Sequence, residues 1–181
     1  MPLSLQKDKL STKYLVLFGM LGGIMFLSKM AMLLIPNVHF LGLFIAAITL
    51  TYRVRALIPL YVFILLDGIY LGFSPFGWVP TLYIWLPLWA SFMVFGKFNV
   101  PKTLKIPIAM LLCAFHGFTF GLMWAPVQAL VFGLSFQGMI AWIVAGIPFD
   151  LIHGFSNLAS GALVIPLAAL LTKLDRELVF S

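Results

Sequence analysis

The chain has 181 residues, of which 63% are hydrophobic and only 9% charged, and its formal net charge is +6. An ordinary soluble domain is roughly 45 to 50% apolar and about 25% charged, so this composition excludes that class and predicts an integral membrane protein. The basic residues are spread between apolar runs instead of forming one tract with aromatic residues, which argues against a nucleic-acid partner. The single cysteine, Cys113, excludes an internal disulfide and a thiolate metal cluster.

Six apolar runs predict six transmembrane helices, because a bilayer core of about 30 Å needs roughly 20 helical residues. The predicted spans cover approximately 14–35, 40–52, 56–73, 79–95, 105–132 and 145–172. No linker, internal repeat or low-complexity segment separates them. We therefore expect one compact all-α bundle that uses the whole chain, residues 1–181.

The basic residues alternate with the predicted spans and thereby predict the orientation of the bundle. Ten of the 11 precede span one, lie between spans two and three or four and five, or follow span six: Lys7, Lys9, Lys13, Arg53, Arg55, Lys97, Lys102, Lys105, Lys173 and Arg176. The connections on the other side, 36–39, 74–78 and 133–142, contain no lysine or arginine. Because cytoplasmic loops are enriched in these residues, both termini are predicted to be cytoplasmic, which requires an even number of spans.

With this orientation, the polar residues of the spans lie between the middle of the bilayer and its outer rim. They are Lys29, Asn37, His39, Asp67, His116, Gln128, Asp150, His153 and Asn157. Charged groups at this depth cost a few kcal/mol if they face lipid, so they must face the bundle interior, a partner or water. A structural network in which Lys29 neutralises Asp67 or Asp150 is one interpretation. An outward-open polar pocket explains better why these polar residues are concentrated in the outer half of the bilayer.

The stretch VAGIPFDLIHGFSN in span six carries the densest group of these polar residues. Asp150, His153 and Asn157 are spaced by three and four positions, so they share one face of a helix. The glycine-flanked segment 133–146 predicts either a lid over the pocket or an extension of span five or six. The predicted pocket lining comprises Asn37, His39, Asp67, Tyr83, Trp85, Gln128, Asp150, His153 and Asn157.

Common catalytic and nucleotide-binding patterns are missing from the chain: HExxH, GxSxG, the Walker lysine loop and the paired carboxylates of DxxD. Asp150 and His153 form DxxH, which supplies two metal ligands and needs a third from His39, His116 or Asp67. We therefore expect no cofactor and no resident metal, and active transport would need an ATP-hydrolysing partner. A small intramembrane enzyme that uses Asp150 and His153 is an alternative, as is a structural subunit without a ligand.

The chain resembles the substrate-binding S components of energy-coupling factor (ECF) transporters in length, in six-span topology and in several segments. The segments are IPNVHFLG, YVFILLDGIYLGF, TLYIWLPLW, CAFHGFTFGLMWAPVQA and GIPFDLIHGFSN, and they look most like a branch that includes cobalamin-type S components. In this family two small residues four apart on the first span, commonly alanines, dock on a scaffold subunit. Here GMLGG supplies Gly19 and Gly23 at that spacing. The alternative is a GxxxG pair that packs helices within the chain.

The resemblance implies a vitamin-binding subunit of a multi-pass transporter in the bacterial plasma membrane, and not an enzyme. Such a subunit captures its vitamin at the extracellular face and delivers it inward, in complex with a scaffold transmembrane subunit and two ATPase subunits. Cobalamin is the vitamin that the resemblance favours, and riboflavin and pantothenate are the alternatives. Aromatic faces would bury the ligand while a few histidine and amide side chains fix its orientation.

Overall fold

The computed structural model describes residues 11–35 and 38–180, with side chains through residue 177, and within this part of the chain only helices and their connections occur. Asn37, one of the predicted pocket residues, lies outside it. The helices are α1 (Thr12–Ala31), α2 (Leu41–Tyr52), the 3-10 helix η1 (Arg53–Ala56), α3 (Leu57–Leu71), α4 (Thr81–Ile84), α5 (Leu86–Phe95), α6 (Lys102–Phe118), α7 (Phe120–Phe132), α8 (Phe136–Gly161) and α9 (Val164–Phe180). The prediction of an all-α protein is confirmed.

Four helical segments of the described chain are long and apolar enough to cross a membrane: Thr12–Ala31, Leu41–Leu71, Lys102–Phe132 and Phe136–Gly161. The segment Thr81–Phe95 is apolar but shorter. Predicted spans two and three both lie in the second of the four segments, because α2, η1 and α3 follow one another directly. The chain is thus a membrane protein by the length and composition of its helices.

The predicted boundaries of span six are wrong at both ends. α8 begins at Phe136 and not near residue 145, and it starts where the Ser135 side chain accepts a hydrogen bond from the backbone N–H of Gly138. Residues 136–146 are therefore the first part of α8 and not a separate lid. α8 ends at Gly161, and α9 begins at Val164, after two intervening residues, with Pro166 in its first turn. Because proline has no N–H to bond the preceding turn, one helix does not continue through this point.

Two other predicted spans are interrupted within their length. Span four breaks at Trp85 between α4 and α5, where Pro87 occupies the first turn of α5. Span five breaks at Thr119 between α6 and α7, where the Thr119 hydroxyl donates to the carbonyl of Phe115. Each break is a single residue long, at Trp85 and at Thr119.

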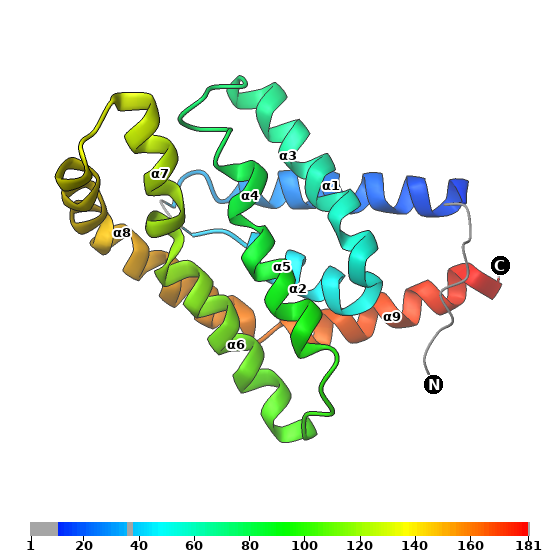
Figure 1. Ribbon diagram of the computed structural model, residues 1–181. Coiled ribbons are helices and arrows are strands. Elements are labelled where there is room, and N and C mark those ends of the chain that lie inside the picture. Colours follow the sequence, from blue (N-terminus) through cyan, green and yellow to red (C-terminus); the bar gives the residue numbers. More distant parts are fainter. Residues whose placement is uncertain (1–10, 36–37, 181) are drawn as a thin grey trace.

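α2 forms the centre of the bundle. Figure 1 shows α2 behind α5, with α6, α7 and α8 on one side and α1 and α3 on the other. Nine of the 12 residues of α2 are buried, since the helix packs against α5, α8 and α9. The start of α1 and the end of α9 lie at the same end of the molecule (Figure 1).

Candidate functional site

Three histidines that are far apart in the sequence meet around Trp85. His39 comes from the connection between α1 and α2, His116 from α6 and His153 from α8. The ring centroids of His39 and His153 are 4.4 Å apart, and His39 and His116 lie 5.7 and 5.4 Å from the centroid of Trp85. Phe120 closes the group, with its ring centroid 4.4 Å from that of His153. The sequence-predicted residues His39, Trp85 and His153 therefore do share one site.

The break between α4 and α5 places Trp85 in this cluster. Pro87 ends the regular helix there, and the Trp85 side chain is buried at 3% exposure. The neighbouring carbonyl of Ile84 is 2.8 Å from His116 Nε2. Since a carbonyl only accepts hydrogen bonds, Nε2 must be the donor, which leaves Nδ1 of a neutral His116 as an acceptor.

Asn157 extends the site by one turn of α8 beyond His153. Its side chain is fully buried, and it lies against Gly42 near the start of α2. A Cβ atom at Gly42 would be 3.2 Å from Asn157 Oδ1, so glycine allows the amide to approach the α2 backbone. His39 and Gly42 on one side and His153 and Asn157 on the other thus form two facing walls.

The defining property of this group is its number of buried polar atoms without a hydrogen-bond partner. Within the described chain these are His39 Nδ1, Trp85 Nε1, His116 Nδ1, His153 Nε2 and both amide atoms of Asn157. Buried polar atoms in proteins are nearly always paired, and each unpaired one costs about 1 to 3 kcal/mol. Their concentration at one place indicates a site where a ligand or ordered water supplies the missing hydrogen bonds. We call His39, Trp85, His116, Phe120, His153 and Asn157 the histidine cluster.

The surroundings of His39 keep its ring uncharged. His39 lies in the connection before α2, outside the four candidate spans, and desolvation together with the nearby charge of Lys29 lowers its pKa to about 4. At neutral pH the imidazole is therefore neutral, with one nitrogen that donates and one that accepts. The cluster is equipped to bind neutral polar groups.

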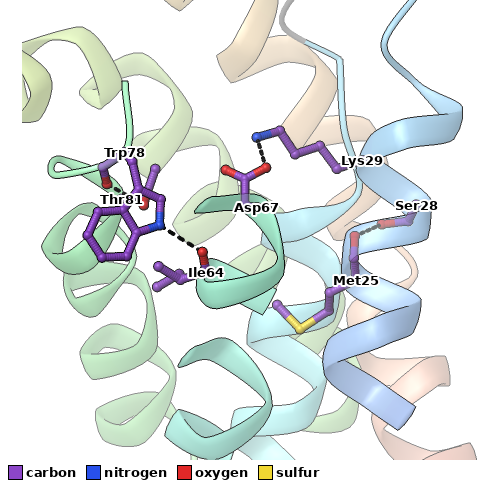
Figure 2. Close-up of polar contacts among 7 residues, drawn as sticks. All are labelled: Met25, Ser28, Lys29, Ile64, Asp67, Trp78 and Thr81. Carbon is purple, nitrogen blue, oxygen red and sulfur yellow. Dashed lines mark hydrogen bonds and ion pairs between the residues drawn. The ribbon is translucent and has the colours of Figure 1, made fainter. Parts of the chain in front are cut away.

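Asp67 is not free to bind a ligand, because it forms an ion pair with Lys29. Lys29 Nζ is 2.5 Å from Asp67 Oδ1, and the Asp67 side chain is 3% exposed (Figure 2). The pair joins α1 to α3, next to the hydrogen bond from Trp78 Nε1 to the carbonyl of Ile64 (Figure 2). Of the two partners that the sequence allowed for Lys29, the structure selects Asp67 over Asp150.

Asp150 and two other predicted lining residues also make contacts within the chain. The Asp150 carboxylate accepts from the backbone N–H of Gly121 at 2.9 Å, in the first turn of α7. Tyr83 Oη donates to the carbonyl of Met123, and Gln128 Nε2 donates to that of Phe76. These three hydrogen bonds fasten α7 to its neighbours.

Two members of the cluster were not among the predicted lining residues. His116 was recognisable as a polar residue near the middle of span five, but its stacking on Trp85 joins two segments that the sequence does not place side by side. Phe120 carries no sequence signal, because it is one of 18 phenylalanines in an aromatic-rich chain. Within the described residues, no group of three or more histidine, cysteine or acidic side chains is arranged to hold a metal ion.

Gly19 and Gly23 lie on a face of α1 that no other part of the described chain covers. A Cβ atom built at either position would have no neighbour within 4 Å. Gly22, between them, instead faces α3, where its Cβ atom would be 2.5 Å from the Val62 side chain. The glycine that packs α1 against its own chain is thus Gly22, and the predicted docking pair is available to another molecule.

No known protein family, curated protein or solved structure matches the chain. The resemblance to S components therefore rests on the segments quoted above, and the functional argument depends on the geometry of the histidine cluster and on the open face of α1.

Proposed function

We propose that the chain is the vitamin-binding S component of an ECF-type importer. The observation that carries the proposal is the histidine cluster, where buried donors and acceptors from α6, from α8, from the connection before α2 and from the break between α4 and α5 converge without partners. A binding site with aromatic walls and a few convergent polar groups is typical of small-molecule pockets. Such unpaired groups also give selectivity, because a near-miss ligand that leaves them unpaired binds weakly.

The chemistry of the cluster favours a ligand with neutral polar groups and a flat or apolar body. Imidazole, indole and amide groups line it, whereas the nearest cation, Lys29, is paired with Asp67. Cobalamin, which carries several amide groups, suits this lining, and riboflavin is the next candidate. Pantothenate carries a carboxylate, for which the described cluster offers no free cationic side chain, so it is the least favoured of the three.

The orientation that we propose puts both termini in the cytoplasm and six spans in the bacterial plasma membrane. The distribution of lysines and arginines supports it, since cytoplasmic connections are enriched in them. The common position of the start of α1 and the end of α9 (Figure 1) also fits an even number of crossings. The histidine cluster then lies toward the extracellular face, where a vitamin arrives.

The open face of α1 is the proposed contact for the scaffold transmembrane subunit, which would carry the two ATPase subunits. Small residues let helices approach closely in a membrane, where packing contacts replace the hydrophobic effect as the main attraction. None of the residues that the structure describes covers Gly19 or Gly23, which favours docking over internal packing.

Identification of the bound molecule tests the proposal directly. The protein would be purified in detergent, any co-purified small molecule extracted for mass spectrometry, and cobalamin, riboflavin and pantothenate titrated by calorimetry. We expect tight binding of one vitamin. His153→Ala and Asn157→Ala should each weaken it by about 5- to 150-fold, the equivalent of one lost hydrogen bond at about 1 to 3 kcal/mol.

Ser156→Ala is the matched control, because Ser156 neighbours Asn157 on α8 but is not part of the cluster. Its affinity should equal that of the unchanged protein. Absence of binding to any vitamin, alongside substrate turnover by the isolated chain, would reject the transporter proposal in favour of an intramembrane enzyme.

A second experiment tests the docking face. Gly19→Leu combined with Gly23→Leu should abolish vitamin uptake and co-purification with the scaffold subunit while vitamin affinity stays unchanged. Gly146→Leu is the control, since Gly146 on α8 is equally open but lies on another helix. If the double variant loses vitamin binding instead, the two glycines serve the fold of this chain.

A further inference from the structure

A second hollow lies away from the histidine cluster, between the ends of α2, α5, α6 and α9. It is a half-open groove of about 300 Å³. Most of its lining is apolar, with Leu50 from α2, Phe95 from α5, and Ile165 and Ala169 from α9. Leu50 follows Gly42, which touches the histidine cluster, by eight residues along α2, or about 12 Å at 1.5 Å per residue. The two sites are therefore separate.

The rim of the groove is positively charged. Lys105, near the start of α6, lines it and has no hydrogen-bond or ion-pair partner within the described chain. Arg53 lies behind the wall at Gly96, where a Cβ atom would be 2.2 Å from Arg53 Nη1. That nitrogen is buried and also has no partner among the described residues. None of the acidic residues that the structure describes lines the groove.

The backbone holds Arg53 at this place in an unusual conformation. Arg53 ends α2 with a φ of 57°, the only positive φ of a non-glycine residue in the described chain. Such conformations cost about 1 to 3 kcal/mol and persist where the surrounding structure enforces them. Here one guanidinium nitrogen donates to the carbonyl of Met93 while the other is directed at Gly96 in the groove wall.

We propose that this groove binds an anionic phospholipid, with one acyl chain in the apolar part and the phosphate next to Lys105, while Arg53 adds its positive charge from behind the wall at Gly96. The volume of the groove is at the lower end of the range for small-molecule pockets, roughly 300 to 1,000 Å³, and is smaller than that of one turn of a helix about 10 Å across. An extended hydrocarbon chain fits both the size and the apolar lining. The basic rim belongs to the end of the bundle that carries Lys97 and Lys102, the predicted cytoplasmic side, where anionic lipids interact with basic residues.

This inference depends on the membrane location of the chain and not on vitamin binding. Native mass spectrometry and thermal unfolding in detergent test it, with phosphatidylglycerol as the probe and phosphatidylcholine as the zwitterionic reference. Phosphatidylglycerol should remain bound as a stoichiometric adduct and raise the unfolding midpoint above that with phosphatidylcholine. Lys105→Gln should weaken phosphatidylglycerol binding by about fivefold, the contribution of one basic residue near a lipid surface.

Ala169→Trp should abolish the adduct by filling the groove, and it tests the acyl-chain contact independently of charge. Ala169 is exposed, so the substitution leaves the core intact, which circular dichroism checks. Lys173→Gln removes the same charge from α9 at a position outside the groove and should leave binding unchanged.

Three outcomes would overturn the proposal. If Lys105→Gln and Lys173→Gln weaken phosphatidylglycerol binding equally, the lipid is attracted by general surface charge and not by this groove. If Ala169→Trp still carries the adduct, the lipid does not occupy the groove. Equal stabilisation by soluble glycerol phosphate and by phosphatidylglycerol would mean an anion site without an acyl chain.

Discussion

The ion pair between Lys29 and Asp67 gives the sharpest test of how this bundle is held together. Asp67 is 3% exposed and Lys29 23% exposed, so the carboxylate depends more on the pair than the ammonium does. Removal of one partner of a buried pair costs about 3 to 5 kcal/mol, because the other charge is left unpaired. Methionine keeps the apolar stem of lysine, so we expect Lys29→Met to lower the free energy of unfolding by about 3 kcal/mol.

The opposite substitution should cost less. In Asp67→Asn the ammonium of Lys29 retains its flexible stem and can turn toward water. We therefore expect the free energy of unfolding to fall by only about 1 kcal/mol. The double variant Lys29→Met/Asp67→Asn should be more stable than Lys29→Met alone, because the second substitution removes the unpaired buried charge. The resulting coupling energy should be about 2 kcal/mol.

Thermal unfolding in detergent, followed by tryptophan fluorescence, measures these differences. For a chain of this length 1 kcal/mol shifts the midpoint by about 2 to 4 °C, so Lys29→Met should lower it by about 6 to 12 °C. Lys13→Met is the control, because Lys13 is exposed on the same helix, and its midpoint should not move. A double variant whose loss equals the sum of the two single losses would refute the ion-pair argument.

Three further substitutions and labels test other contacts. Asp150→Ala should lower the free energy of unfolding by about 1 to 2 kcal/mol in the same assay, because the N–H of Gly121 loses its acceptor; unchanged stability would contradict this. Gly22→Leu should disrupt the contact between α1 and α3, because a Cβ atom at this position would already be 2.5 Å from the Val62 side chain. We expect this variant to aggregate in size-exclusion chromatography, and a monodisperse variant would contradict the close packing of Gly22 on α3. Cys113 is fully buried, so a maleimide should label it only after unfolding in dodecyl sulfate; labelling of the folded protein would argue against its burial.

The sequence predicted the class of the fold well but not the course of the individual helices. An 18-residue or longer apolar run indicates a membrane helix whatever the tertiary structure, and α1 and α8 follow that rule. The breaks at Trp85 and before Pro166 each lie beside a proline that the sequence shows. A prediction from run length and hydropathy alone nevertheless gives one continuous helix through each of them. The break at Thr119 has no proline to mark it, and on either side of it α6 and α7 pack against α8.

The candidate site was predicted in part. The spacing of His153 and Asn157 placed both on one face of a helix, and the structure confirms that both are buried in the histidine cluster. Asp67 and Gln128 were grouped with them because their depths along the spans agree, and Asp150 because its spacing puts it on the same helix face as His153. Neither depth nor spacing fixes which group a side chain contacts, and these three bind other parts of the chain instead.

By itself the sequence determined that the environment of this protein is a membrane. The free-energy cost of placing residues in water or lipid depends on composition, run length and charge, and these are properties of the chain alone. Only the tertiary structure decided the pairings: Lys29 with Asp67 and not Asp150, and His39 with His153 from the other end of the chain. Such contacts depend on where helices break and cross, and those positions follow from packing among distant residues.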